Sequence, residues 1–300
     1  MTLYPNCKIN LGLRVIRKRE DGYHDLETIF VPIYGLHDEL EVEPMPTTSF
    51  KGNETFTFQQ EGITVDCRPE DNLIIKCYQN MAAKYPQIQP VSIRFRKNIP
   101  FGAGLGGGSS DAAHMAIALN QLFHLGLTRE QLAAEVRPLG ADCPFFIYNT
   151  PCYAEGIGDR LTPIHLPLQG TRIVLVKPDE GVSTREAYSG IKPHPEAAQG
   201  IKTAIAQSKK SLSTLDSLLS TVFVNDFEQT VFPLHPAIER IKKRLLSAGA
   251  FYASMSGSGS TVFGLFEDDA ESRTNAQFRM FEQEFASMIL LNDTFGEWKA

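Results

Sequence analysis

Five glycines fall within the seven positions from Gly102 to Gly108, inside the stretch IPFGAGLGGGSSDAA that runs from residue 99 to residue 113. Each glycine in an ordered element costs about 0.5 to 1 kcal/mol relative to alanine, and the net stability of a domain is only about 5 to 15 kcal/mol. An alternating apolar run (91–95) precedes the cluster, and apolar residues at helical spacing (112–123) follow it. The order of strand, glycine loop and helix indicates that the glycine loop binds a ligand.

A glycine loop that opens a helix is suited to bind phosphate. Backbone N–H groups and the positive end of the helix dipole meet there, and glycine lets the backbone approach phosphate oxygens closely. Ser109 and Ser110 add hydroxyl groups at the start of the helix. Two common nucleotide motifs do not fit, since no acidic residue stands near position 122 for a dinucleotide fold and Ser109 follows the last glycine where a Walker loop needs lysine.

The N-terminal region predicts a β-hairpin. Apolar and polar residues alternate from Ile9 to Val15, so that Lys8 and Asn10 project together from the face opposite the core. Asp21-Gly22 is a turn signal, and the second apolar run, 29–31, follows it.

Further along the chain, strands and helices continue to alternate. Thr128 and Gln131 predict a capping box for a helix that ends near Pro138. Two strands and two helices are then expected, at 172–177 and 261–266 for the strands and at 237–248 and 278–288 for the helices. Ser189 to Ser213 is polar and predicts a surface excursion with some helix.

Composition narrows the class of protein. A formal charge of −6 argues against a general binder of nucleic acid or of membrane surfaces, so any phosphate site must be local. No run of about 18 apolar residues is present, and the N-terminus lacks an apolar signal core. We expect a cytoplasmic protein with reduced thiols, because five cysteines without metal-site spacing are present: Cys7, Cys67, Cys77, Cys143 and Cys152.

The string Pro100-x-x-x-Gly104-Leu105-Gly106-Gly107-Gly108-Ser109-Ser110 resembles the phosphate loop of the GHMP kinases, the superfamily of galactokinase, homoserine kinase, mevalonate kinase and phosphomevalonate kinase. The alternative is a glycine-rich turn without a ligand. The resemblance implies ATP binding, with Mg²⁺, and assigns to the nucleotide Lys97, Pro100, Gly102, Ala103, Gly104, Leu105, Gly106, Gly107, Gly108, Ser109 and Ser110.

Other segments resemble one family within that superfamily, the 4-diphosphocytidyl-2-C-methyl-D-erythritol kinases. They are Lys8-Ile9-Asn10-Leu11, Asp21-Gly22-Tyr23-His24, Leu139 to Phe145, Ala154 to Gly158 and Ser254 to Ser260. The resemblance implies ATP-dependent phosphorylation of the C2 hydroxyl of a cytidine diphosphate-linked methylerythritol, in the non-mevalonate route to isoprenoid precursors. The expected partner is therefore a small-molecule substrate, without nucleic acid or membrane.

The same resemblance implies a two-domain α+β fold. An N-terminal nucleotide-binding domain (1–160) would be followed by a ferredoxin-like C-terminal domain (161–300), with the substrate in the cleft between them. The sequence sets neither the oligomeric state nor the ligands of the magnesium ion.

Carried onto this chain, the resemblance implies that Asp142 accepts or orients the proton of the attacking hydroxyl group. It also implies that Lys8 lies beside Asp142 and beside the transferring phosphoryl group. Such a pair suits a loose transition state that needs alignment and charge neutralisation more than a strong base. The alternative is a structural ion pair. Cys143 invites comparison with a nucleophile, but without a positioned histidine base a small buried filler is favoured.

For the substrate, the resemblance assigns Tyr23 and Tyr188 to the two faces of the cytosine, His24 to its polar edge and Asn10 to the methylerythritol. The alternatives are core or turn roles for the tyrosines, a buried turn for Asn10 and a surface position for Lys97. Gly257 to Gly259 either places amides near the substrate diphosphate or forms a tight strand connection.

The chain departs from the family pattern at Asn6-Cys7, where Pro-Ala is common, at Gly12 and at Asp159. None of these removes a proposed chemical group. Another GHMP kinase with a different acceptor is one alternative function, which Tyr23-His24 opposes. A catalytically silent nucleotide sensor of the same fold is another, which Lys8 and Asp142 oppose.

Overall fold

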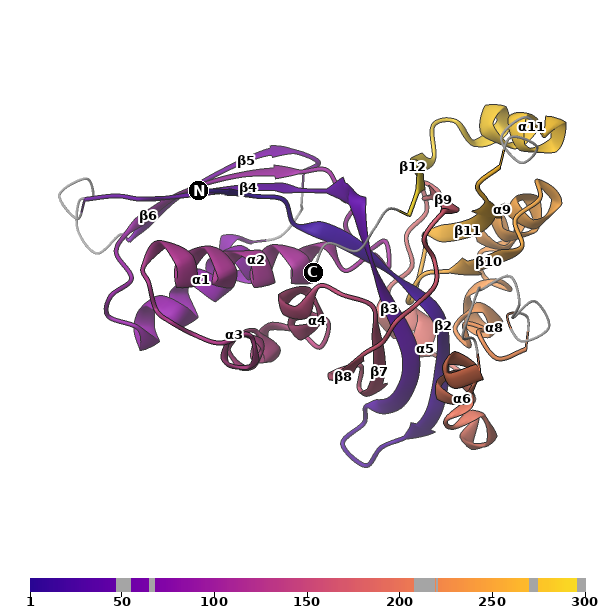
Figure 1. The fold of residues 1–300 in the computed structure, drawn as a ribbon, viewed down its shortest axis with the longest axis horizontal. Coiled ribbons are helices and arrows are strands. Elements are labelled where there is room, and N and C mark those ends of the chain that lie inside the picture. Colours follow the sequence, from indigo (N-terminus) through magenta and orange to yellow (C-terminus); the bar gives the residue numbers. More distant parts are fainter. Residues whose placement is uncertain (47–54, 65–67, 208–218, 220, 270–274, 296–300) are drawn as a thin grey trace. The chain divides into compact units, whose positions relative to one another are not determined.

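The computed structural model describes residues 1–46, 55–64, 68–207, 219, 221–269 and 275–295. The strands are β1 (Thr2–Leu3), β2 (Asn6–Lys18), β3 (His24–His37), β4 (Glu39–Pro44), β5 (Phe56–Gly62), β6 (Val91–Lys97), β7 (Cys152–Gly156), β8 (Arg160–Pro163), β9 (Thr171–Val176), β10 (Tyr252–Met255), β11 (Val262–Glu267) and β12 (Ile289–Thr294). The helices are α1 (Leu73–Lys84), α2 (Gly107–Leu122), α3 (Arg129–Val136), α4 (Cys143–Tyr148), α5 (Thr184–Tyr188), α6 (Gly200–Gln207), α8 (Glu228–Val231), α9 (Pro236–Ser247) and α11 (Ala276–Phe285), with short 3-10 turns at Pro69–Asp71, Arg137–Leu139 and Pro195–Ala197. The predicted α+β content is confirmed (Figure 1).

The chain forms two compact units, each described by itself. The first contains Met1–Lys8, Pro32–Phe101 and Gly106–Asn149, and the second contains Ile9–Val31, Gly102–Leu105 and Thr150–Ala300. The units are therefore interleaved in sequence, whereas the two domains expected from the sequence are continuous. The assignment of residues 1–160 and 161–300 to two domains of the family remains a prediction.

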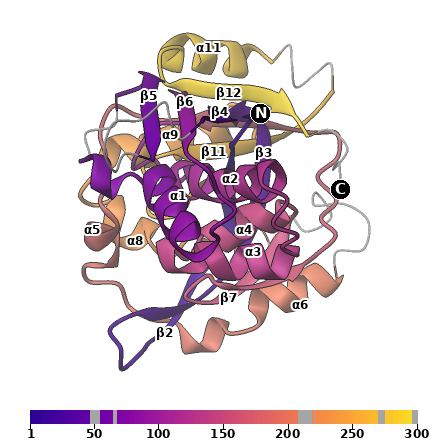
Figure 2. The same cartoon turned by 90° about the vertical axis from the view of Figure 1, so that its left-hand side faces the viewer.

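The first unit is a sheet covered by helices. Its strand order is β1-β4-β6-β5, with β4 antiparallel to β1 and β6, and β5 parallel to β6. Val91, Ile93 and Phe95 of β6 are buried as the alternation predicts. The helices α1 and α2 lie along one face of this sheet, and α4 packs on α2 and α3 (Figure 2).

The predicted hairpin is confirmed. In a sheet of order β2-β3-β7-β8, the strands β2 and β3 are neighbours, and the backbone N–H of Arg19 donates to the carbonyl of Tyr23 across the turn at 2.8 Å. Gly22 has a φ of 87°, which favours glycine at that position of the turn. Most of this hairpin belongs to the second unit.

The second unit also has the expected ferredoxin-like sheet. The order β10-β11-β9-β12, antiparallel throughout, arises from a βαββαβ succession in the chain. The continuous apolar run in β9 is buried from Arg172 to Val176, and α9 packs on β10 and β11. Phe278, Phe281 and Phe285 of α11 face this core, which confirms the predicted amphipathic helix.

Other local predictions have mixed outcomes. The capping box of Thr128 and Gln131 is present at the start of α3. The helix α4 is not predicted by the sequence, because a helix of six residues is too short to show an apolar periodicity. The excursion predicted at Ser189–Ser213 contains α6, while residues 208–213 lie outside the described part of the chain.

The core of the second unit yields a stability prediction. Phe281 is 0% exposed, whereas its neighbour Met280 on the same helix is 55% exposed. We expect Phe281→Ala to lower the free energy of unfolding by about 3 to 5 kcal/mol, because it leaves a cavity among aromatic rings. Urea unfolding followed by circular dichroism measures the loss, with Met280→Ala as the control that stays near wild type. Equal stabilities of the two variants would contradict the packing described.

Candidate active site

Lys8 and Asp142 form an ion pair within the first unit. The Nζ of Lys8 lies 3.3 Å from the Oδ2 of Asp142. The lysine side chain is 5% exposed and the aspartate side chain 31% exposed, so the cation is held inside while the carboxylate remains open to solvent. Lys8 is placed by β2, and Asp142 immediately precedes α4. The structure thus brings together the two residues predicted to be catalytic.

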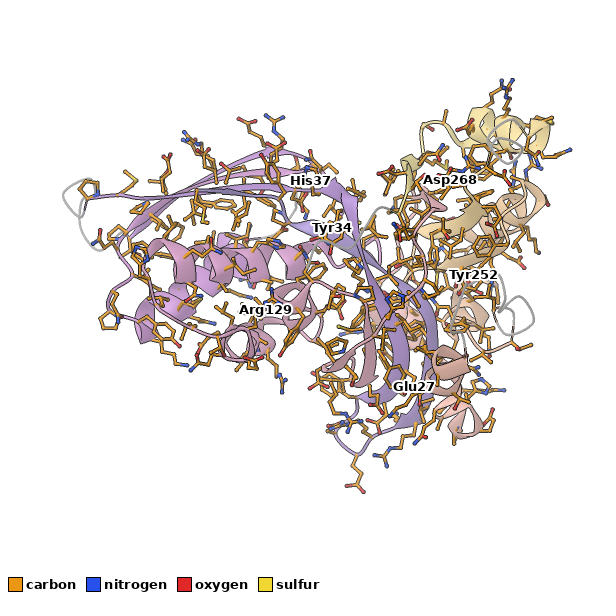
Figure 3. All side chains as sticks on the ribbon, viewed as in Figure 1. Glu27, Tyr34, His37, Arg129, Tyr252 and Asp268 are labelled. Carbon is orange, nitrogen blue, oxygen red and sulfur yellow. The ribbon has the colours of Figure 1, made fainter. Side chains whose placement is uncertain are left out.

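The helix α4 is fixed to β2 and β3 at its other end as well. The side chain of Asn149, which follows α4, donates from Nδ2 to the Oδ1 of Asn6 at 2.8 Å. The hydroxyl of Tyr34 on β3, labelled in Figure 3, donates to the carbonyl of Asn149 at 2.8 Å. Asn6 stands two residues before Lys8, so β2 contacts both ends of the helix that follows Asp142. In the sequence, Asn6 is marked only by its departure from the family pattern.

The C-terminal half of the glycine loop opens α2 in the first unit. Gly106 is the N-cap residue, with a φ of 70°, and α2 begins at Gly107 without a side-chain cap. A Cβ on Gly106 would lie 3.1 Å from the Cγ and the Cε of Lys8 and 3.0 Å from the Cζ of Phe146. The lysine stem therefore packs directly against the loop. The uncapped amides of the first turn suit a phosphate group.

The N-terminal half of the loop belongs to the second unit and packs on the other glycine string. A Cβ on Gly104 would lie 2.0 Å from the carbonyl oxygen of Ser256, and the Ser256 hydroxyl donates to the carbonyl of Gly104 at 2.8 Å. The backbone N–H of Thr261 donates to the carbonyl of Ala103. Gly257 and Gly259 lie in a tight connection closed by the Ser256 N–H on the Thr261 carbonyl at 2.9 Å. The structure therefore has the tight strand connection that the sequence allowed for Gly257 to Gly259. A contact of this string with the substrate diphosphate remains a prediction.

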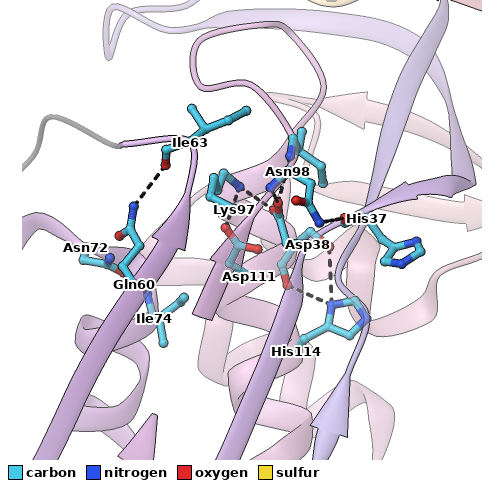
Figure 4. Close-up of polar contacts among 12 residues, drawn as sticks. His37, Asp38, Gln60, Ile63, Asn72, Ile74, Lys97, Asn98, Asp111 and His114 are labelled. Atoms are coloured by element: carbon cyan, nitrogen blue, oxygen red, sulfur yellow. Dashed lines mark hydrogen bonds and ion pairs between the residues drawn. The ribbon is translucent and has the colours of Figure 1, made fainter. Parts of the chain in front are cut away.

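Lys97 is buried beneath the start of α2. Its side chain is 3% exposed, and its Nζ lies 2.5 Å from the Oδ2 of Asp38 and 2.9 Å from the Oδ2 of Asp111 (Figure 4). A Cβ on Gly107 would lie 3.0 Å from the same Nζ. Asp38 also accepts the backbone N–H groups of Asn98 and Ile99. The surface position considered for Lys97 is wrong, because its charge is compensated inside the unit.

Lys97, Asp38 and Asp111 form a buried triad, in which two negative charges face one positive charge when all three groups are ionised. Burial raises the pKa of Asp111 well above its ordinary value, and its Oδ1 has no hydrogen-bond partner among the described residues. Burial works against the Lys97 ammonium, but Asp111 and Asp38 together raise the pKa of Lys97. Lys97 therefore stays charged and fixes the base of the glycine loop. Its predicted contact with the adenosine remains a prediction.

Asn10, two residues after Lys8 on β2, is buried in the second unit. Its Nδ2 donates to the hydroxyl of Thr28 at 3.0 Å, and its backbone N–H donates to the hydroxyl of Ser256 at 3.3 Å. Its Oδ1 lies 3.3 Å from the position of a Cβ on Gly257. Asn10 is therefore in a strand next to the second glycine string and not at a turn.

The aromatic residues are arranged differently from the expected pair of tyrosines. The ring of His24 stacks on the ring of Tyr188 at 4.9 Å between centroids, and Tyr188 also meets Phe227 edge to face at 4.7 Å. Tyr23 is 62% exposed, which rules out a core role. Burial, followed by the charge of Lys18, lowers the pKa of His24. The cytosine-binding roles of all three residues remain predictions.

Cys143 gives no support to the nucleophile alternative. It is buried, and burial raises the pKa of its thiol to about 12, so the thiolate is strongly disfavoured. Cys7, Cys77, Cys143 and Cys152 are free thiols, and Cys67 lies outside the described residues.

Comparison with known proteins assigns this chain to a family. The model described as "GHMP kinases N terminal domain" matches residues 72–150, and the one described as "GHMP kinases C terminal" matches residues 201–280. A 4-diphosphocytidyl-2-C-methyl-D-erythritol kinase from Bacteroides thetaiotaomicron is 48% identical over 270 residues, which cover 90% of this chain and 93% of that protein. The chain belongs to the 4-diphosphocytidyl-2-C-methyl-D-erythritol kinase family.

Other members of the kinase family agree. The protein of that name from Parabacteroides distasonis is 46% identical over 281 residues, covering 93% of this chain and 96% of the relative. A crystal structure of 4-(cytidine 5'-diphospho)-2C-methyl-D-erythritol kinase superposes with a TM-score of 0.75 at 31% identity, over 99% of this chain and 100% of the other. A homoserine kinase from Cytophaga hutchinsonii, at 19% identity and a TM-score of 0.68, shares the fold over 89% of this chain and 87% of its own.

Among the described residues, no helix combines the length and the apolar character needed to cross a bilayer.

The glycine loop of this kinase family member yields a second prediction. We expect Gly104→Ala to weaken ATP binding by about tenfold or more, equivalent to about 1.4 kcal/mol, because the new Cβ would collide with the Ser256 carbonyl and displace the loop. Isothermal titration calorimetry with Mg²⁺ and a non-hydrolysable ATP analogue measures the affinity. Gly126→Ala is the control, since Gly126 has a φ of 70° but no atom within 4 Å of its Cβ position. Unchanged affinity of Gly104→Ala would contradict the packing.

The triad yields a third prediction. Lys97→Met leaves two buried carboxyl groups without their ammonium, so we expect it to lower the free energy of unfolding by about 3 to 5 kcal/mol at neutral pH. The loss should shrink in acid, where the carboxyl groups bind protons. Urea unfolding from pH 4 to pH 8 measures it, with Lys76→Met as the control, because Lys76 pairs with Asp71 on the surface. A loss independent of pH would argue against the triad as its cause.

Proposed function

We propose that this chain transfers the γ-phosphoryl group of ATP to the C2 hydroxyl of 4-diphosphocytidyl-2-C-methyl-D-erythritol, giving the 2-phosphate for isoprenoid precursor synthesis. The observation that carries the proposal is the Lys8–Asp142 ion pair, with the lysine stem packed against the glycine loop. Family membership supplies the reaction, and the geometry supplies residues able to perform it.

Asp142 is proposed to accept the proton of the attacking hydroxyl. Its carboxylate is partly exposed, so an alcohol can reach it, and Lys8 holds it in place from the buried side. The Lys8 ammonium also offers positive charge to a transferring phosphoryl group. Alignment and charge compensation of this kind account for most catalysis of phosphoryl transfer, because the transition state is loose.

The glycine loop is proposed to hold the ATP phosphates on the first turn of α2. The absence of a side-chain cap at Gly106 leaves amide donors for phosphate oxygens, and Ser109 would add a hydroxyl group. Ser110 is buried, with its hydroxyl 3.3 Å from the Nδ1 of His114, so its contact with the nucleotide remains a prediction. Mg²⁺ would neutralise phosphate charge. Among the described residues, no group of three or more histidine, cysteine or acidic side chains could hold a metal ion.

The remaining substrate roles are proposed from the family resemblance and from position. Tyr23 is exposed and free to stack on a base, while the stacked pair of His24 and Tyr188 offers a second ring and a polar edge. Asn10 would orient the methylerythritol. Binding of cytosine would require the His24 and Tyr188 rings to accommodate it.

We further propose that the protein acts in the cytoplasm on this small molecule, without nucleic acid. The four described thiols are free, as expected in a reducing compartment, and the formal charge of −6 is unfavourable for general phosphate-backbone binding. Against a silent sensor stands the intact Lys8–Asp142 pair.

A turnover assay tests the proposal. The purified protein is incubated with Mg²⁺, ATP and the cytidine diphosphate substrate, and phosphorylated product is measured beside mevalonate, homoserine and galactose. We expect selective turnover of the cytidine diphosphate substrate. Turnover of another acceptor would identify a different GHMP kinase, and ATP binding without any turnover would identify a sensor.

The catalytic pair yields a fourth prediction. We expect Asp142→Asn and Lys8→Ala each to lower kcat by about two orders of magnitude or more while the protein remains folded, because proton acceptance and charge compensation are lost. The assay above measures kcat, with Asp71→Asn as the control for an exposed paired carboxylate. Near-normal turnover of either variant would refute the role assigned to it.

A further inference from the structure

His235 joins two carboxylates in the second unit. It immediately precedes α9, and its side chain is 16% exposed. Its Nδ1 lies 2.7 Å from the Oε2 of Glu180, and its Nε2 lies 3.1 Å from the Oε1 of Glu186. A carboxylate accepts hydrogen bonds and donates none, so both contacts require a hydrogen on each ring nitrogen. The geometry is that of a doubly protonated imidazolium bridging two segments.

Among the described residues, the charged groups in contact with this ring are the two glutamates. Glu239, one turn later on α9, pairs with Lys243 at 2.7 Å. Glu228 on α8 pairs with Lys242 at 2.5 Å. Lys177 donates to the carbonyls of Pro178 and Glu180. Hydrogen bonding to Glu180, opposed by partial burial and reinforced by Glu186, raises the pKa of His235 above its ordinary value of 6.5.

The carboxylates belong to a segment that carries a proposed substrate residue. Glu186 lies in α5, which ends at Tyr188, the residue stacked on His24. At the other end, the Glu180 carbonyl accepts from the Ser260 hydroxyl at 2.7 Å, next to the second glycine string. His235 therefore ties both ends of the segment 180–188 to the start of α9.

The helix α5 depends on such ties for its position. It has only five residues, and a helix this short is not stable by itself. Ser183 caps its start, and the Thr230 hydroxyl donates to the Ala187 carbonyl at 2.7 Å. The ion pair between His235 and Glu186 is a third contact that holds the same helix, and we call this contact the tie. Losing the imidazolium should shift α5 while the other two bonds keep it folded.

We propose that protonated His235 positions α5 so that Tyr188 is held for the base of the substrate, and that substrate affinity falls as His235 loses its proton. The inference rests on the proposed function for the identity of the substrate. His235 is a positioning residue, since it acts through Glu186 and α5. Because its proton is bound more tightly in the folded chain than in the unfolded chain, the tie is present at low pH and is lost as the pH rises above 6.5.

Steady-state kinetics between pH 6 and pH 9 test the proposal. We expect the KM for the cytidine diphosphate substrate to rise by about fivefold to tenfold across this range, the scale of one charge-assisted hydrogen bond, while the KM for ATP shows no such step. His235→Gln should have the high KM at every pH, and Glu186→Gln, which removes the charged contact between His235 and α5, should likewise abolish the step. The exposed His165 supplies the control His165→Gln, which should behave like wild type. A wild-type KM without a step, or a step retained in His235→Gln, would overturn the proposal.

His24 also titrates, so its contribution must be separated. Burial, followed by Lys18, lowers the pKa of His24, whereas that of His235 is raised, and the two steps should fall on opposite sides of 6.5. Nitrogen NMR of the intact protein follows both imidazoles directly. We expect both ring nitrogens of His235 to be protonated at pH 6.5, and deprotonation to shift the ring signals of Tyr188 and His24.

This NMR measurement keeps the inference separate from the proposed function. If no acceptor is turned over, the proposed function fails, but the coupling between His235 and the Tyr188 ring is still measured. If turnover is normal and His235 titrates without moving the Tyr188 signals, the inference fails and the proposed function stands.

Discussion

The buried ammonium of Lys97, shared by Asp38 and Asp111, sets the position of the C-terminal half of the glycine loop, which belongs to the first unit. Removing three ionisable groups from water is unfavourable unless each finds a partner with good geometry. Here the lysine comes from the end of β6, one carboxylate from Asp38 between β3 and β4, and the other from the first turns of α2. The strand that precedes the loop and the helix that follows it are thereby held at one point. The glycines at the start of α2, which would otherwise be free to adopt many conformations, are thereby confined.

The Lys8–Asp142 pair follows from that arrangement. The lysine stem passes beside Gly106, the residue that ends the loop, and no larger side chain would fit there without displacing the stem. The loop and the ion pair are consequently parts of one packed region. The amides of Asn6 and Asn149 then fix the far end of α4, so that the carboxylate is placed by a short helix held at both ends. An exposed carboxylate on a mobile loop would spend much of its time elsewhere, at an entropic cost to any reaction that needs it aligned.

Much of this could be predicted from the sequence, for identifiable reasons. The hairpin, β9, α9 and α11 have periodicity or turn signals that depend on neighbouring residues alone. The glycine loop and its helix were predictable because the string from Pro100 to Ser110 is specific. Asp38 and Asn149 were not, since neither lies in a motif and each acquires its role from residues distant in the chain. Asp111 stands within the quoted glycine stretch, but nothing local shows that its carboxyl group turns inward to Lys97. The stacking of His24 on Tyr188 likewise depends on tertiary packing.

The depth of the Lys97 triad has a consequence for how the protein responds to ionic strength. Salt screens charges that are exposed to solvent and acts far less on charges enclosed by protein. With both partners of Lys97 nearly inaccessible, the anchor of the loop should be insulated from the electrolyte. The attraction of an anionic nucleotide to the open face of the same loop has no such protection. A change in salt can thus alter how strongly the nucleotide is attracted while the shape of the loop that receives it stays constant.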